Sequence, residues 1–468
     1  MARRIGLLAW LLMVCISAVL LSLNGCGGGA STGGSTSGTG QKIQHVVIIF
    51  QENRTPDNLF QDPALIAKGA DIQTFGVNST GEKIPLAPQP LGVDYDLSHA
   101  HDAFVLMYDG GKMDGADKIL LLCNDGMCQT PPPPNPQFWS VNPSEVQPYF
   151  KMAETYTFGD RMFQTNQGPS FPAHQYIISG TSAPSANSKL FVAENPEGDS
   201  RFFTDAGCIA PPDEFVFLID PAGKESSSIY PCFDHPTLTD QLDAKGISWR
   251  YYSPSAGVIW TAPNAIKHMC VPNAPIPNAT ACTGSDWTDH VVLNQSQVLT
   301  DIAAGTLDSV TWVIPTGLAS DHPGSSDANL GPSWVASVVN AIGNSQFWSN
   351  TAIIIAWDDW GGWYDHVAPT VINSYERGFR VPLIVISPYA KAGYISHVEH
   401  DFGSILKFIE ETFNLTTVAP GYADTRSDDL SDCFDFNQTP LQFQTIPARH
   451  DAKFFIDRKR DETPPDDD

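Results

Sequence analysis

Basic residues are scarce in this sequence. Its 468 residues include 26 lysines and arginines against 52 aspartates and glutamates, so the formal net charge is −26. Proteins that bind nucleic acids carry a basic stripe or patch that neutralises phosphates, and no such cluster occurs here. We therefore expect no nucleic-acid partner. A secreted or surface protein fits this charge better.

Cysteines are few, and their spacing does not suit a structural metal site. There is no Cys-x-x-Cys pair and no finger-like Cys/His spacing, which argues against structural zinc. Seven of the nine cysteines lie outside the N-terminal stretch, and six of them are close enough in sequence to form loop-pinning disulfides. The candidate pairs are Cys123 with Cys128, Cys208 with Cys232 and Cys270 with Cys282, which leaves Cys433 odd. Spacing alone does not fix this connectivity.

Two further signatures are missing from the globular part of the chain. The Gly-x-Ser-x-Gly elbow of the α/β-hydrolases is absent there, so acyl transfer by that route has little support. No internal repeat occurs, which argues against a repeat architecture.

The N-terminus carries a long apolar run. Arg3 and Arg4 precede the apolar residues 5–23, and the run closes with Leu-Asn-Gly-Cys at Cys26, which resembles a bacterial lipobox. We expect 1–26 to be a signal peptide and 27–41 to be a Gly/Ser-rich tether. The mature protein would then be periplasmic or at the cell surface, anchored to the membrane by a lipid on Cys26. An ordinary cleaved signal, which would give a secreted protein, and a short membrane anchor stay open.

The rest of the chain is expected to form one globular domain. Large α/β enzymes often use this length for one sheet with long loops, and we place the domain at 42–455. Residues 195–300 are rich in proline, glycine, asparagine and serine, which predicts a loop-rich insertion. Residues 456–468 form an acidic tail without apolar content and are expected to be disordered.

Strand-like and helix-like patterns alternate within this domain. Apolar runs of strand length and stretches with helical periodicity at this spacing predict an α/β fold, with a central, mostly parallel sheet flanked by helices. The expected strands are 45–50, 310–314, 352–356 and 383–386, and the expected helices are 146–154, 332–344 and 402–413.

Two of the expected strands end in polar pairs. The strand at 45–50 leads to Glu52 and Asn53, and the strand at 352–356 leads to Asp358 and Asp359. Ligands of open α/β sheets collect at the carboxyl ends of the strands, and clustered hard oxygens suit a divalent cation. Each pair alone could simply cap a strand or the next helix. Two such pairs favour a metal site.

A constrained serine and a histidine are further candidates. Ser170 lies between Pro169 and Phe171 in a Gly-Pro-Ser-Phe-Pro turn, which can present a nucleophile at a helix N-terminus, where amides also receive an anion. His322 follows the strand at 310–314 by a short loop and could hydrogen-bond a phosphoryl oxygen or protonate a leaving alkoxide. A serine in such a turn, or any single histidine, is more often structural.

Several segments together resemble a known family. In order and number they are similar to the motifs of the bacterial phosphoesterase family that includes phospholipases C and acid phosphatases, within the alkaline-phosphatase-like superfamily, over about 45–415. The segments are ENRTPDNLF (52–60), DLSHAHDAF and DGGKMDG (96–115), GDRMFQTNQGPSFPAHQYIISGTS (159–182), HPTLTDQLDAKGISWRYY (235–252), SDHP (320–323), WDDWGGWYDHV (357–367) and RVPLIVISPYAKAGYISHVEHDFGSILKFIE (380–410).

The resemblance implies a metal site. Glu52, Asn53, Asp358 and Asp359 would bind one divalent cation, in an alkaline-phosphatase-like fold. An all-oxygen set of ligands favours calcium, magnesium or manganese.

The resemblance also implies the catalytic groups. Ser170 would be the nucleophile and would form a phosphoserine intermediate. His99 and His322 would contact the transferring phosphoryl group, with Asp321 standing where relatives often have glutamate. Two more histidines, His235 and His397, are weaker candidates.

The expected function is an exported, metal-dependent phosphoesterase that hydrolyses phosphate mono- or diesters, of the acid phosphatase or phospholipase C type. Its partner would be a phosphate ester or phospholipid substrate. A non-catalytic lipoprotein that binds phosphorylated ligands is the alternative. Four aromatic residues of the 195–300 stretch could receive a lipid headgroup or pack in the core; they are Trp249, Tyr251, Tyr252 and Trp260.

Overall fold

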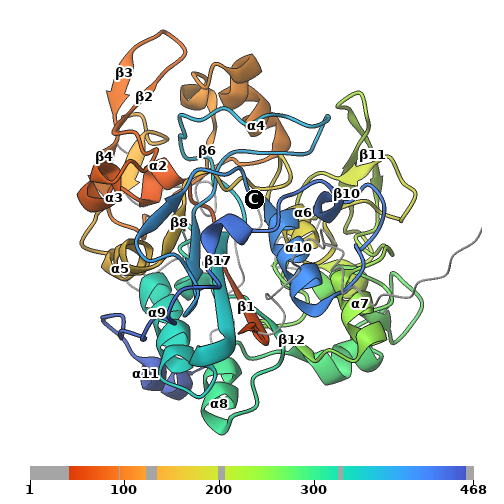
Figure 1. The fold of residues 1–468 in the computed structure, drawn as a ribbon. Coiled ribbons are helices and arrows are strands. Elements are labelled where there is room, and N and C mark those ends of the chain that lie inside the picture. The colour runs from red at the N-terminus through yellow and green to blue at the C-terminus, as the bar shows by residue number, and fades with distance from the viewer. Residues whose placement is uncertain (1–41, 94, 123–133, 199–205, 325–329, 460–468) are drawn as a thin grey trace, which may run out of the picture. The chain divides into compact units, whose positions relative to one another are not determined.

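An eight-stranded sheet lies at the centre of the computed structural model (Figure 1). The structure describes residues 42–93, 95–122, 134–198, 206–324 and 330–459, all within one compact unit, Gly38–Asp468. The two innermost strands, β1 (His45–Gln51) and β17 (Thr351–Trp357), run parallel along their full length. Their apolar runs are buried on both faces, as expected for strands covered by helices on each side.

Seven of the eight strands run in the same direction. Only β18 is antiparallel to both of its neighbours, β17 and β8. The sheet is therefore mostly parallel, as predicted, and 383–386 is its antiparallel strand. No helix connects β17 to β18 along 358–382, and parallel strands normally need such a crossover. The order across the sheet is β15 (Val291–Val292), β12 (Trp249–Tyr252), β16 (Val310–Val313), β1, β17, β18 (Leu383–Ile386), β8 (Thr157–Gly159) and β19 (Tyr394–Ser396).

Helices cover both faces of this sheet, so the predicted α/β class with a mainly parallel central sheet is confirmed (Figure 1). One group packs together on one side and consists of α5 (Gln147–Thr155), α8 (Gln297–Ala304), α9 (Leu330–Gly343) and α11 (Ala452–Asp457). The other group consists of α6 (Ser170–Ser179), α7 (Leu238–Lys245) and α10 (Phe402–Phe413). Helix α10 has the predicted bounds, and its Asp401 cap accepts a bond from the Ser404 amide.

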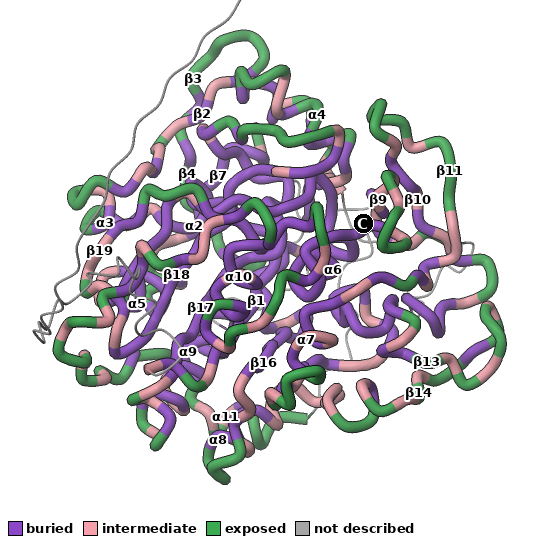
Figure 2. Tube along the Cα trace, turned by 45° about the vertical axis from the view of Figure 1, so that its right-hand side comes forward, coloured by how far each residue is buried: buried purple, intermediate pink, exposed green. Residues whose placement is uncertain are grey.

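The stretch 195–300 takes part in the central sheet. It supplies β12 and β15 at one edge and also contains α7, which packs against α6. Its four aromatic candidates, Trp249, Tyr251, Tyr252 and Trp260, are fully buried. The core-packing interpretation is therefore the correct one. Figure 2 shows that buried residues fill the centre of the molecule, around β1, β17 and α6.

Two disulfides pin loops in the same stretch. Cys208 pairs with Cys232 and Cys270 pairs with Cys282, as predicted. Cys433 is a free, buried thiol. The proposed pair Cys123 and Cys128 lies outside the described residues.

Shorter elements complete the fold. They are α2 (Pro56–Leu59), α3 (Pro63–Ala67), β2 (Phe75–Val77), β3 (Lys83–Pro85), β4 (Ala87–Gln89), β5 (Asp96–Leu97), α4 (His101–Tyr108), β6 (Leu121–Leu122), β7 (Trp139–Val141), β9 (Phe191–Val192), β10 (Val216–Ile219), β11 (Glu225–Ile229), β13 (Val271–Pro272) and β14 (Cys282–Thr283). None of the helices in the described ranges is both long and apolar enough to cross a lipid bilayer.

Candidate active site

The ends of β1 and β17 bring the two polar pairs together. The Asp358 amide donates a hydrogen bond to the Gln51 carbonyl (3.0 Å), and the Asn53 amide donates to Asp358 Oδ1 (3.1 Å). Parallel pairing in register places the first residues after both strands at the same edge of the sheet. Three carboxyl groups, those of Glu52, Asp358 and Asp359, are consequently buried side by side.

Ser170 is the first residue of α6, as the sequence predicts. Its Oγ donates a hydrogen bond to Asp359 Oδ2 (3.1 Å), and the side chain is buried. The helix offers little to an anion, however, because the Phe171 amide already donates to Asn195 Oδ1 (2.9 Å) and Pro172 has no N–H. Of the first three positions of the described helix, only Ser170 retains an amide for an anion.

His99 and His322 meet at the side chain of Asn53. The Asn53 Nδ2 atom lies 3.2 Å from His99 Nε2 and 2.9 Å from His322 Nε2. The Nδ1 atoms of the two rings face backbone carbonyls, those of Leu97 (2.9 Å) and Pro323 (2.6 Å). Because a carbonyl only accepts, each ring carries its proton on Nδ1 and turns Nε2 toward the site.

His174 also belongs to the site, although no sequence motif predicts a role for it. Its Nε2 lies 3.3 Å from Glu52 Oε1 and 3.7 Å from Asp358 Oδ2, and these three side chains are spaced as a metal-binding group. The signal was present in the sequence. His174 follows Ser170 by four residues, and on a helix that spacing places both side chains on one face.

Burial changes the protonation behaviour of these groups. Desolvation, reinforced by the neighbouring Asp358 carboxylate, raises the pKa of both Glu52 and Asp359 well above the ordinary range. Desolvation also lowers the pKa of His174 to about 4, so its ring is neutral at physiological pH. Within the described parts of the chain, no lysine or arginine pairs with these carboxylates. A divalent cation would offset this buried negative charge, so the residues present fit one.

The loop Asp358–His366 reaches the site through a glycine pair. Gly361 has φ +60°, and a Cβ built on it would lie 2.5 Å from the Asn53 carbonyl oxygen. Gly362 has φ +72°, and its Cβ would lie 2.4 Å from the Cβ of Leu97. The two glycines therefore let the loop that carries Asp359 pack against the segments that carry Asn53 and His99.

Three other candidates lie outside this group. The Asp321 carboxylate accepts bonds from Tyr149 Oη (2.7 Å) and Trp357 Nε1 (3.2 Å). His235 contacts the Ala183 carbonyl and Ser179, and His397 pairs with Asp160. None of these contacts involves Ser170 or the carboxylates of Glu52, Asp358 and Asp359.

A second acidic group resembles a metal site but already contains a cation. Asp57, Asp365 and His366 lie close together. The Arg380 guanidinium binds both oxygens of Asp365 (2.8 and 2.9 Å) and lies 3.3 Å from Asp57 Oδ1. This fully buried ion-pair network anchors the far end of the loop that carries Asp358 and Asp359.

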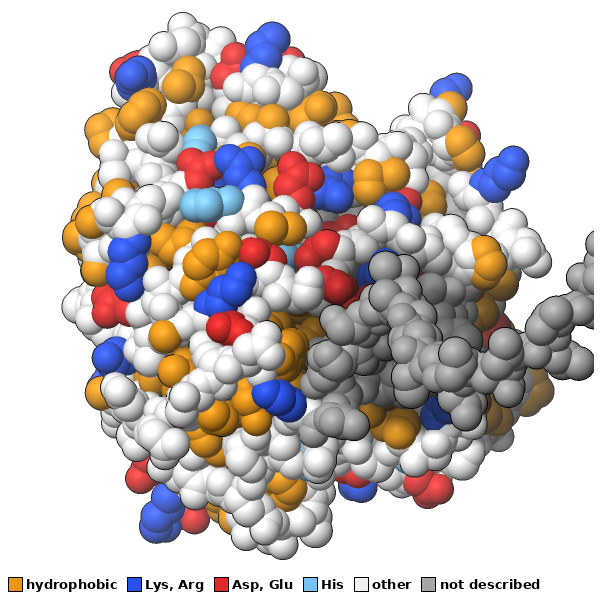
Figure 3. Space-filling model, in the orientation of Figure 1, with side chains coloured by type: hydrophobic (Ala, Val, Ile, Leu, Met, Phe, Trp, Pro, Cys, Tyr) orange, Lys and Arg blue, Asp and Glu red, His pale blue; other side chains and the backbone are white. Residues whose placement is uncertain are grey.

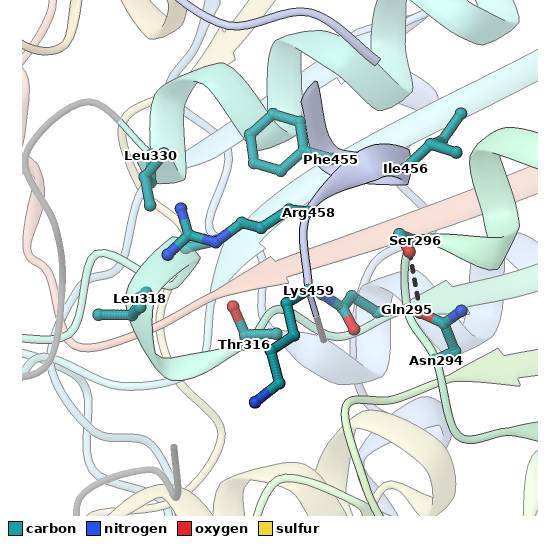
Figure 4. A pocket seen from close by; sticks show the side chains of 11 residues that line it. Asn294, Gln295, Ser296, Thr316, Leu318, Leu330, Phe455, Ile456, Arg458 and Lys459 are labelled. Atoms are coloured by element: carbon teal, nitrogen blue, oxygen red, sulfur yellow. Dashed lines mark hydrogen bonds between the residues drawn. The ribbon is translucent and has the colours of Figure 1, made fainter. Parts of the chain in front are cut away.

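The surface shows little of this site, since its side chains are almost completely buried. On the face seen in Figure 3, lysines and arginines stand singly among acidic and apolar side chains. A surface pocket of about 210 Å³ is lined in part by Thr316, Leu330, Phe455 and Arg458 (Figure 4). None of the residues of the candidate active site lines this pocket.

The chain is similar in sequence to known proteins. The sequence pattern of the Phosphoesterase family matches residues 43–416. The chain is 25% identical over 454 residues to the hemolytic phospholipase C of Pseudomonas aeruginosa, covering 86% of this chain and 57% of that protein. It is 30% identical over 483 residues to the non-hemolytic phospholipase C of Burkholderia pseudomallei, covering 88% of this chain and 61% of that protein. The chain thus spans about six-tenths of the length of these relatives.

Solved structures give a weaker similarity. A protein of the alkaline phosphatase superfamily from Vibrio parahaemolyticus aligns with 83% of this chain and 70% of its own, at 10% identity and a TM-score of 0.36.

Proposed function

Because the chain belongs to the phosphoesterase family, we propose that it is a metal-dependent hydrolase of phosphoric esters in which Ser170 is the nucleophile. The observation that carries this proposal is the hydrogen bond from Ser170 Oγ to Asp359 Oδ2 (3.1 Å), at the edge of the sheet where Glu52, Asn53 and Asp358 also lie. A serine hydroxyl within hydrogen-bond distance of a carboxylate has an acceptor for its proton.

Glu52, Asn53, Asp358 and Asp359 would hold the cation. When bound, a divalent cation supplies Lewis-acid stabilisation of the charge on the phosphoryl oxygens and lowers the pKa of a nearby hydroxyl. Two buried carboxylate oxygens, Glu52 Oε2 and Asp358 Oδ2, have no hydrogen-bond partner among the described residues. Such atoms fit a cation better than an empty space, since an unpaired buried charge is costly.

The remaining groups support a two-step reaction. Ser170 Oγ attacks phosphorus while Asp359 accepts its proton, and the bond from phosphorus to the leaving oxygen breaks. In the imidazolium form, with a second proton on Nε2, His322 or His99 would donate that proton to the leaving oxygen, after which water hydrolyses the phosphoserine and releases phosphate or a phosphomonoester. Asn53, which contacts both rings, keeps the two Nε2 atoms aimed at one point.

The names of the relatives support a substrate class. They are phospholipases C by name, which favours phospholipid-type diesters, and phosphate monoesters fit the same chemistry. A panel of aryl phosphate, bis-aryl phosphate and phosphatidylcholine, assayed with each divalent metal across pH, tests the activity and ranks these classes.

The Ser170→Ala variant tests the nucleophile. We expect it to lose at least about 1,000-fold in kcat/KM, because the variant lacks the hydroxyl that would form the covalent intermediate. Ser337→Ala, a buried serine on α9, is the matched control and should keep full activity. If the wild type hydrolyses no ester with any metal but still binds phosphorylated ligands, the non-catalytic lipoprotein is the better description.

We also propose export and anchoring at Cys26. The proposal is supported by Arg3, Arg4, the apolar run 5–23 and the lipobox-like Leu-Asn-Gly-Cys. Cells fed labelled palmitate should label the wild type but not Cys26→Ser. Wild-type protein that carries no palmitate label and is found in the culture medium would indicate a secreted protein instead.

A further inference from the structure

The metal site suggested by the geometry includes a nitrogen atom. His174 Nε2 lies 3.3 Å from Glu52 Oε1 and 3.7 Å from Asp358 Oδ2, and all three side chains are fully buried. The family resemblance implies a set of oxygen ligands only, and such a set gives His174 no role in binding the metal. Its position on α6 is fixed by the same helix that presents Ser170.

The spacing of these atoms is close to that of ligands sharing one ion. Bonds of about 2.1 Å to nitrogen and oxygen place two neighbouring ligands roughly 3.0 to 3.5 Å apart. The 3.3 Å separation lies within this range, and the 3.7 Å separation lies just beyond it. A simple hydrogen bond from His174 to Glu52 would satisfy only one carboxylate oxygen. Glu52 Oε2 and Asp358 Oδ2 would remain buried without a partner among the described residues, and both belong to the same group of side chains.

We propose that His174 is a ligand of the metal held by Glu52 and Asp358, and that this mixed nitrogen and oxygen set selects a first-row transition ion over Ca²⁺ and Mg²⁺. This inference rests on the metal site of the proposed function, and it adds which class of metal ion that site binds. Imidazole suits zinc, copper, iron and nickel, whereas calcium and magnesium prefer oxygen ligands. Of the three metals expected from the sequence, manganese is the only first-row transition ion.

The test reads the metal without any substrate. Purified full-length protein is stripped with a chelator and loaded with Mn²⁺, and electron spin-echo modulation then detects a directly bound ¹⁴N nucleus. Binding of Co²⁺, Mn²⁺, Ca²⁺ and Mg²⁺ is measured by calorimetry. For the wild type we expect ¹⁴N modulation and affinities for Co²⁺ and Mn²⁺ at least about 100-fold above those for Ca²⁺ and Mg²⁺.

The His174→Gln variant should lose the ¹⁴N modulation. It should also lose about 10- to 100-fold in affinity for Co²⁺, with little change for Ca²⁺. His235→Gln, a buried histidine that also has a pKa of about 4, and His322→Gln should both keep the ¹⁴N signal. If His174→Gln does not fold, His174→Asn takes its place. In addition, when the wild-type protein contains ¹⁵N-labelled histidine, the ¹⁴N modulation must be replaced by ¹⁵N modulation.

Two results would overturn the inference: metal-loaded wild type without ¹⁴N coupling, or ¹⁴N coupling that survives the loss of His174. Failure of the wild type to bind any of these metals would also overturn it. A different result would overturn the proposed hydrolysis. If the wild type shows ¹⁴N coupling but hydrolyses no ester, the proposed function fails while His174 is still a metal ligand.

Discussion

Ser170 Oγ and Asp359 Oδ2 lie 3.1 Å apart although 189 residues separate them in the chain. The contact joins the N-terminus of α6 to the loop after β17, and both ends are buried. Asp359 Oδ2 also lies 3.9 Å from His99 Nε2. One carboxylate oxygen thus stands between the proposed nucleophile and a proposed phosphoryl-binding histidine.

The first prediction concerns Asp359→Asn. An amide oxygen can still accept the Ser170 hydrogen bond but takes up no proton, so kcat should fall by about 100- to 10,000-fold. Steady-state kinetics on an aryl phosphate with saturating metal measures this. Asp424→Asn, a buried aspartate remote from the site, is the control and should retain kcat. A kcat for Asp359→Asn within a few-fold of wild type would remove Asp359 as proton acceptor.

The second prediction concerns Gly361→Ala. The residue has φ +60° and its Cβ would lie 2.5 Å from the Asn53 carbonyl oxygen, so both backbone strain and a steric clash are expected. Gly246→Ala is the matched control, because Gly246 has φ +65° and open space around its Cβ. Gly361→Ala should destabilise the fold by at least about 1 kcal/mol more than Gly246→Ala, measured by urea unfolding. Equal destabilisation by the two variants would show that the predicted clash of the Gly361→Ala side chain with Asn53 does not lower the free energy of unfolding.

The third prediction concerns Arg380→Met. Removing the guanidinium leaves Asp57 and Asp365 buried with His366 as the one cationic partner among the residues that the structure describes. This loss should cost about 3 to 5 kcal/mol of unfolding free energy. Guanidinium-chloride unfolding measures the loss. A surface control, Lys453→Met, breaks an exposed pair with Asp457 and should change little.

The same network offers a rescue. Adding Asp365→Asn to Arg380→Met removes one of the two stranded charges and should recover part of the lost stability. A double variant that is less stable than Arg380→Met would argue that Asp365 is held by something other than charge.

The fourth prediction concerns pH. Burial, together with the neighbouring Asp424, raises the pKa of Glu410 from 4.5 to about 8. Both carboxylates accept from the Val418 amide, at 3.2 and 2.9 Å. A raised pKa in the folded state means that the folded protein holds this proton more tightly than the unfolded chain. The stability from Glu410 is therefore complete below about pH 4.5 and is lost as the pH rises through about 8.

Glu410→Gln removes this loss. Relative to wild type, the variant should become more stable as the pH is raised from about 5 to about 9, as measured by urea unfolding at each pH without metal. Glu197→Gln, an exposed glutamate, is the control and should track the wild type. A constant difference between Glu410→Gln and wild type across this range would contradict the shifted pKa.

The sequence predicted much of the fold because its signals are local. The apolar runs at 45–50 and 352–356 form strands, and the cap and periodicity of 402–413 form a helix with those bounds, since each depends on residues within one element. The placement of Glu52, Asn53, Asp358 and Asp359 at one sheet edge also follows locally, because each pair directly follows its strand.

Contacts between distant segments were decided only by tertiary structure. The antiparallel direction of β18 depends on the path that the chain takes along 358–382. The place of β12 in the central sheet could not be predicted, because a strand of four residues is too short to show a clear sequence pattern. Asp321 was a candidate by its neighbour His322, yet its carboxylate turns to Tyr149 and Trp357. His174 entered the site because folding brings one face of α6 against the ends of β1 and β17. The sequence alone determined the strands at 45–50 and 352–356, the serine at the start of α6 and the two polar pairs. The packing of α6 on the sheet decided which side chains meet these pairs, because two side chains far apart in sequence have no local signal.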